Sequence, residues 1–159
     1  MATKLLYNPA VEAPPAYDQD LAAWAHHQAM LLRAGQVQSV DRAHIAEEMD
    51  DVGSEQYDRL ESALRLVLIH MLKWDHQPAR QSRSWTLTIR EQRIRISRQL
   101  RRNPSLAARR EEVLSDAYGD ARYGAGIETD LPLKNFPETC PYSWQDIMTR
   151  PFNWPGDDD

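Results

Sequence analysis

Apolar residues recur every three or four positions along most of the chain, which is the spacing of amphipathic α-helices. Residues 17–33 predict a first helix that Asp18 opens and Gly35 stops. A second predicted helix begins at Asp41, whose side chain favours a helix N-terminus, and ends at Gly53. We therefore expect two helices in the first third of the chain.

The widest apolar stripe lies in residues 54–77, between a capping Ser54 and a terminating Pro78. Such a stripe is typical of a helix that is buried on most sides, so this segment predicts the core helix. Residues 84–102 also alternate like a strand, but their length without glycine or proline favours a helix. Asn103 and Pro104 then predict the start of a helix that runs toward Tyr123.

Five prolines follow Gly124 and exclude regular structure there, except for one short helix that Ser143 can cap. Such a tail is expected to wrap the helices and to bury Phe136, Trp144, Ile147 and Phe152. The predicted fold class is all-α, a bundle of about five helices with an irregular proline-rich C-terminal tail wrapping the bundle. Its expected organisation is an extended N-terminal arm at residues 1–16, a single helical domain at residues 17–155 and an acidic tail at residues 156–159.

Composition favours an ordinary globular protein, with 42% hydrophobic and 27% charged residues in 159 positions. The single cysteine, Cys140, cannot form an internal disulfide and so does not indicate an oxidising compartment. No apolar run approaches the roughly 18 residues that span a bilayer. The sequence therefore predicts a cytoplasmic protein without a membrane partner.

The net charge of −5 conceals three blocks of opposite sign. Residues 41–61 carry eight acids and two arginines, residues 80–110 carry ten arginines and one acid, and residues 111–159 carry eleven acids and three bases. Whole-chain charge argues against general DNA binding, whereas the basic block alone can attract an anion. The alternation favours charge matching within the fold or between subunits.

Several stretches resemble a bacterial family known as domain of unknown function family 29. They are YDQDLAAWAHHQAMLLRAG, HIAEEMDDVG, HMLKWDHQPARQSRSW with TIREQR, NPSL, and AYGDARYGAGIETDLPLKNFPETCPYS, and they are spread from about Tyr17 to Tyr142, over most of the chain. The resemblance implies an all-α fold in a bacterial cytoplasmic protein, and association with itself or with a related chain. It implies no established activity.

The candidate binding residues surround the basic block. On a helix, His70 and Trp74 share a face with Lys73 beside them, which suits anion binding or a general base. The alternative is a histidine hydrogen-bonded in the core, with Trp74 packed and Lys73 extending to solvent. The arginine forks match carboxylate or phosphate oxygens. The full candidate set is His70, Lys73, Trp74, Arg83, Trp85, Arg90 and Arg93.

A metal site is a weaker interpretation, with Glu47, Glu48 and His70 as its candidates. The di-iron bundle pattern repeats Glu-x-x-His on two helices, whereas this chain has only the reverse order, His-x-x-Glu, once, from His44 to Glu47. His44 and Glu48 are four positions apart and share a helix face. We expect no metal, no cofactor and no catalytic residue.

The sequence thus predicts a non-enzymatic helical module that self-associates or pairs with a related partner. Two alternatives remain open. One is nucleic-acid or phosphate binding through residues 83–102, and the other is a metal-dependent enzyme that uses Glu47, Glu48 and His70.

Overall fold

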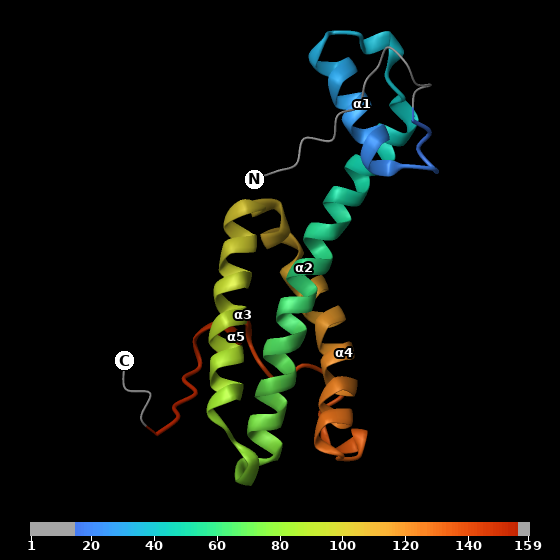
Figure 1. The fold of residues 1–159 in the computed structure, drawn as a ribbon. Coiled ribbons are helices and arrows are strands. Elements are labelled where there is room, and N and C mark those ends of the chain that lie inside the picture. The colour runs from blue at the N-terminus through green and yellow to red at the C-terminus, as the bar shows by residue number, and fades with distance from the viewer. Residues whose placement is uncertain (1–14, 156–159) are drawn as a thin grey trace. The chain divides into compact units, whose positions relative to one another are not determined.

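The computed structural model describes residues 15–155, and these residues form helices joined by short turns (Figure 1). The described residues contain no strand, so the predicted all-α class is confirmed. The predicted acidic tail and nearly all of the predicted N-terminal arm lie outside the described residues. The α-helices are α1 (Leu21–Arg33), α2 (Arg42–His76), α3 (Arg83–Arg102), α4 (Arg110–Thr129) and α5 (Trp144–Thr149).

The chain divides into two compact units, unit 1 up to Val52 and unit 2 from Gly53 onward. Helix α2 contributes its first part to unit 1 and the remainder to unit 2. Each unit is described by itself below.

Helix α1 begins later than the sequence suggests. The side chain of Asp20, and not that of Asp18, accepts a hydrogen bond of 2.9 Å from the backbone N–H of Ala23. The prediction for Asp18 is therefore wrong, because a second aspartate two positions on fills the same capping role. The predicted stop at Gly35 is confirmed by its φ of +73°, a conformation that glycine adopts without steric cost.

Helix α2 continues through Gly53, so the predictions that Gly53 ends one helix and that Ser54 caps the next are wrong. A glycine inside an exposed helix costs only about 1 kcal/mol relative to alanine, which a 35-residue helix tolerates. The predicted start at Asp41 and the predicted end before Pro78 are confirmed. The Asp41 side chain accepts from the N–H of His44 at the start of α2, and the helix ends at His76, just before Pro78.

In unit 2 the second part of α2 lies beside α3 and α4 (Figure 1). Its buried stripe packs against apolar residues of the other two helices, and the resulting cluster is the core of the protein. Each such side chain, when fully removed from water, contributes roughly 1.5–3 kcal/mol. The fully buried members include Leu60, Leu64, Leu68, Met71, Leu72, Ile89, Ile96 and Val113.

The C-terminal tail covers this core as predicted, burying Phe136, Ile147 and Phe152, with Trp144 half-buried. It starts later than expected, because α4 continues past Gly124 and ends at Thr129. Ser143 caps α5 in a reciprocal arrangement with Asp146, in which each side chain accepts from the other residue's backbone N–H.

Two glycines of α4 predict opposite responses to alanine. A Cβ at Gly119 meets no atom within 4 Å, so Gly119→Ala should raise the free energy of unfolding by about 0.5–1 kcal/mol. A Cβ at Gly124 would lie 2.8 Å from Cδ1 of the buried Ile69, and Gly124→Ala should lower it by about 1–2 kcal/mol. Urea titrations of both variants measure the difference.

The Ile69→Val substitution removes the clashing Cδ1 and serves as the control for this contact. In the double variant with Gly124→Ala, the loss should be smaller than the sum of the two single losses. Additive losses, or equal behaviour of the two glycine variants, would contradict a close approach of α4 to α2 at this point.

Candidate functional site

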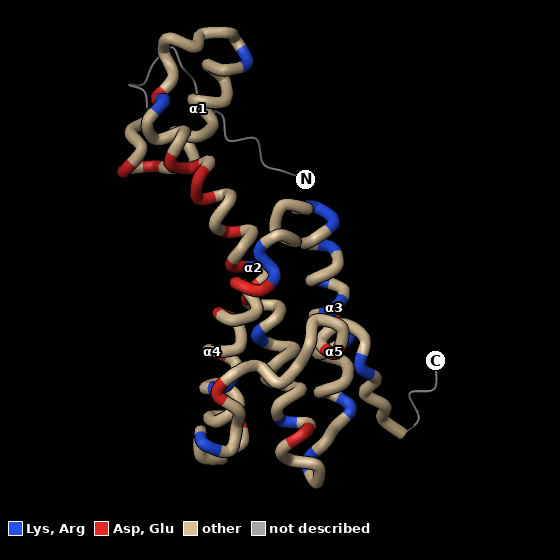
Figure 2. Tube along the Cα trace, turned by 180° about the vertical axis from the view of Figure 1, so that it is seen from behind, with Lys and Arg blue, Asp and Glu red and all other residues tan. Residues whose placement is uncertain are grey.

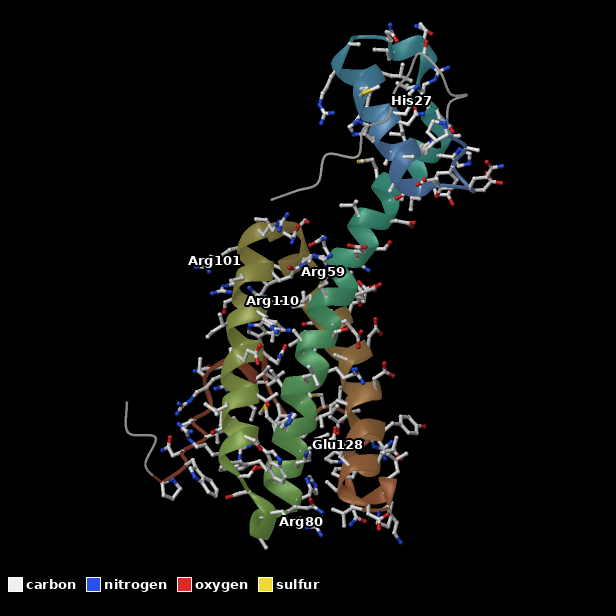
Figure 3. All side chains as sticks on the ribbon, in the orientation of Figure 1. His27, Arg59, Arg80, Arg101, Arg110 and Glu128 are labelled. Atoms are coloured by element: carbon white, nitrogen blue, oxygen red, sulfur yellow. The ribbon has the colours of Figure 1, made fainter. Side chains whose placement is uncertain are left out.

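The structure brings three charged or aromatic side chains of unit 2 together, one from each of α2, α3 and α4. The ammonium of Lys73 in α2 lies 2.5 Å from a carboxylate oxygen of Glu128 in α4 and 4.6 Å from the ring centre of Trp85 in α3. Figure 3 labels Glu128 on α4, on the side that faces α2. Lys73 is 8% exposed, so the expectation that it extends to solvent is wrong. The sequence placed Lys73 and Trp85 in the candidate set but missed Glu128, which is 55 positions away from Lys73.

His70 lies one turn before Trp74 on α2 but does not share its surroundings. Its Nδ1–H donates a 2.8 Å hydrogen bond to the carbonyl oxygen of Leu66, which leaves Nε2 of the neutral ring as an acceptor. Burial lowers the pKa of His70, and the nearby charge of Lys73 adds to this effect. Trp74 instead packs edge-on against Phe152 of the tail, at 5.5 Å between ring centres.

Arg93, another member of the candidate set, is occupied by the tail. Its Nε–H donates to the carbonyl oxygen of Ile147 at 2.6 Å and a terminal N–H to that of Asp146 at 3.1 Å. The guanidinium also lies 5.3 Å from the ring of Phe152. Burial lowers the pKa of Arg93, with a further contribution from the charge of Arg150. Arg93 thus holds α5 against α3.

One face of α3 remains open. We call the exposed residues Leu87, Arg90, Ile94, Arg98 and Arg101 the α3 ridge, because their spacing of three and four places them on one side of the helix. Leu87 is 43% exposed and Ile94 is 53% exposed. The arginines of the ridge have no side-chain partner among residues 15–155. Figure 2 shows the basic positions along α3, and Figure 3 labels Arg101 near its C-terminal end.

Charge matching inside the fold does not account for this face. Arg95 pairs with Glu91 one turn earlier on the same helix, at 2.6 Å. Arg83 is exposed and makes further contacts of its own. Leaving Arg83 aside, no ion pair among residues 15–155 joins an arginine of α3 to an acid of another helix.

Unit 1 presents a second open surface, the α1–α2 groove. It is a depression of about 590 Å³ between α1 and the first part of α2. The side chains along it are almost all apolar, and several are large and exposed, such as Met49 at 64%. Those from α1 are Leu21, Ala22, Trp24, Ala25, Gln28, Ala29 and Leu32, and those from α2 are Ile45, Glu48, Met49 and Val52.

Asp41 holds the two helices of unit 1 together. Its backbone N–H donates to the side-chain oxygen of Gln28 at 2.8 Å, and its carboxylate accepts from the indole N–H of Trp24 at 3.4 Å. The same carboxylate accepts from Nδ1–H of His44 at 2.6 Å. The ring of Tyr17 stacks on His44 at 4.0 Å between centres. Apart from the capping role of Asp41, no pattern in the sequence indicates this cluster.

This cluster predicts a pH dependence of unit 1. The hydrogen bond with Asp41 raises the pKa of His44, and the same bond lowers the pKa of Asp41. The contribution of His44 is therefore complete below its unfolded pKa of 6.5 and is lost as the pH rises through the raised value. The contribution of Asp41 is present above 3.8 and is lost as the pH falls through the lowered value.

We accordingly expect unit 1 to be most stable in the mildly acidic range. Amide hydrogen exchange of the first turns of α2, followed against pH, measures this. His44→Gln should remove the loss of protection on the alkaline side, whereas His26→Gln, at an exposed position of α1, should leave it in place. An unchanged profile in the His44 variant would show that the pair with Asp41 does not contribute.

The candidate metal residues fall in different units. Glu47 and Glu48 belong to unit 1, where Glu48 accepts a hydrogen bond of 2.8 Å from the hydroxyl of Tyr17, and His70 belongs to unit 2. Within the described part of the chain, no group of three or more His, Cys, Asp or Glu side chains is placed to hold a metal ion.

The described residues form an all-α protein whose core is covered by the C-terminal tail. Its open surfaces are the basic α3 ridge and the apolar α1–α2 groove, which lies beside the acidic first part of α2. No helix of residues 15–155 has the length and apolar character needed to cross a bilayer. Residues 16–153 match the family described as Domain of unknown function DUF29, and the chain belongs to this family. No curated protein and no solved structure matches the chain.

Proposed function

We propose that this protein is a non-enzymatic interaction module of the bacterial cytoplasm, which associates with a second copy of itself or with a related chain. The observation that carries the proposal is the α1–α2 groove of unit 1. Exposed apolar side chains of this extent usually mark an interaction site, because water contact with a contiguous apolar surface is unfavourable.

The small core of unit 1 supports the same proposal. Trp24 is the one large apolar side chain that is buried in residues 15–52, while Leu21, Leu32, Met49 and Val52 are all exposed. A segment below about 40 residues seldom buries enough surface to be stable alone and usually gains its stability from a partner. A protein that covers the groove would bury these exposed apolar side chains and so enlarge the core of unit 1.

Light scattering of the purified protein across a wide concentration range tests the proposal. We expect the weight-average mass to rise with concentration, and the association to weaken as salt is increased, because the charges that surround the open surfaces are screened. A protein that stays monomeric at every concentration and brings no related chain through purification would contradict it.

A second candidate function is the binding of phosphate groups, including those of nucleic acids. The observation that favours it is the set of exposed arginines on the α3 ridge that have no partner among residues 15–155. The ring of Trp85, the only aromatic residue of α3, is already covered by Lys73 and so is not available for stacking on a base. A gel-shift titration at low salt decides this, because each neutralised phosphate should steepen the salt dependence of binding.

A further inference from the structure

We infer that the α1–α2 groove of one copy binds the α3 ridge of a second copy, so that the chains associate head to tail. This inference rests on the proposed self-association and specifies which two surfaces meet. Both surfaces are exposed, both combine apolar and charged side chains, and they lie in different units of the chain.

The apolar parts of the two surfaces have matching lengths. On the ridge, Leu87 and Ile94 are seven residues apart on one face of α3, which is about 10.5 Å along a helix. On the α2 side of the groove, Ile45, Met49 and Val52 also span seven residues at spacings of four and three. A helix that lies in this groove can therefore place two apolar side chains against both walls.

The charges of the two surfaces are opposite. The first part of α2 is acidic through Glu47, Glu48, Asp50 and Asp51, and Glu48 is the one of these that lines the groove (Figure 2). The apolar residues of the ridge are instead flanked by arginines. Guanidinium groups beside carboxylates favour this pairing and its register.

A symmetrical contact between two grooves is less favourable for the same reason. It would cover the apolar walls, but it would place Glu48 of one copy in the same interface as Glu48 of the other. Like charges placed in one interface disfavour such a contact. Among residues 15–155, the ridge is the helix face that combines large exposed apolar side chains with arginines.

Contacts between two different surfaces leave a free ridge at one end of the assembly and a free groove at the other. Such an assembly grows into a chain or closes into a ring, and it is not restricted to dimers. This property gives the inference a direct test, because a variant that lacks one surface can still bind a variant that lacks the other.

The test uses two variants of the full chain. The groove variant is Leu32→Ser with Met49→Lys, and the ridge variant is Leu87→Glu with Ile94→Glu; all four residues are large and exposed, so folding should be retained. The matched control is Ile127→Glu, which makes the same kind of change at an 83% exposed position of α4 outside both surfaces. Circular dichroism and thermal melting check that each variant is folded.

We expect each variant alone to associate at least about tenfold more weakly than the wild-type chain, a loss of roughly 1.4 kcal/mol. An equimolar mixture should form a one-to-one complex that does not grow further, because each copy keeps the surface that its partner needs. The control should associate like the wild type.

Two results would overturn the inference while leaving self-association intact. One is a ridge variant that associates as strongly as the wild type, which would indicate contact between grooves. The other is a mixture that forms no complex although the wild type associates. A wild-type chain that is monomeric at all concentrations would overturn the proposed function and this inference together.

Discussion

Replacement of Phe136 by alanine is expected to lower the free energy of unfolding by about 3–5 kcal/mol, the range for removal of a fully buried phenyl ring. Phe136 is 1% exposed and its ring packs against that of His76 at 4.8 Å between centres. Its own carbonyl oxygen accepts a hydrogen bond from Arg122, and the next carbonyl, of Pro137, accepts one from Tyr118. The ring therefore fixes the point at which the tail meets α4 and the end of α2.

Chemical denaturation of Phe136→Ala measures this loss, and Tyr123→Ala is the matched control. Tyr123 is also aromatic and lies on α4, but it is 62% exposed, so its removal should change stability by less than about 0.5 kcal/mol. Equal effects of the two substitutions would mean that the tail does not contribute to the core of the protein.

The pair between Lys73 and Glu128 predicts an asymmetric response. Glu128→Ala leaves the buried ammonium of Lys73 without its carboxylate, and we expect it to cost about 1–3 kcal/mol. Lys73→Met keeps an unbranched apolar chain against Trp85 and leaves behind only a Glu128 side chain that is 44% exposed, so it should cost less than about 1 kcal/mol.

The double variant separates this explanation from a general loss of packing. If the unpaired ammonium is the cause, then Lys73→Met with Glu128→Ala should be about as stable as Lys73→Met alone. Urea titrations of the three variants measure it. A double variant that loses the sum of both single effects would refute the explanation.

The sequence predicts the helical class and most helix ends, because these depend on local periodicity and on capping residues such as Asp41 and Ser143. It fails at Gly53 and Gly124, where glycine is read as a stop although the helix continues. The helix propensity of glycine is only about 1 kcal/mol below that of alanine, and tertiary packing outweighs it. At Gly124 the missing side chain allows close contact with Ile69, which no local pattern reveals.

The candidate site is predicted less well than the fold. Residues that share a face in sequence, such as His70, Lys73 and Trp74, have different partners in space, because the neighbouring helix and the tail decide what each one meets. The α1–α2 groove is not visible in the sequence at all. An apolar stripe looks the same whether another element covers it or leaves it open, so only the packing distinguishes the buried face of α2 in unit 2 from the exposed one in unit 1.

The way in which arginines hold the tail has an evolutionary consequence. Arg93 and Arg122 donate to main-chain oxygens, which every amino acid supplies, and not to particular side chains. Substitutions at the accepting positions therefore preserve these bonds, provided that the backbone keeps its path. Among homologous chains, Arg122 should therefore vary less than Leu133, a half-buried tail residue whose carbonyl group it contacts.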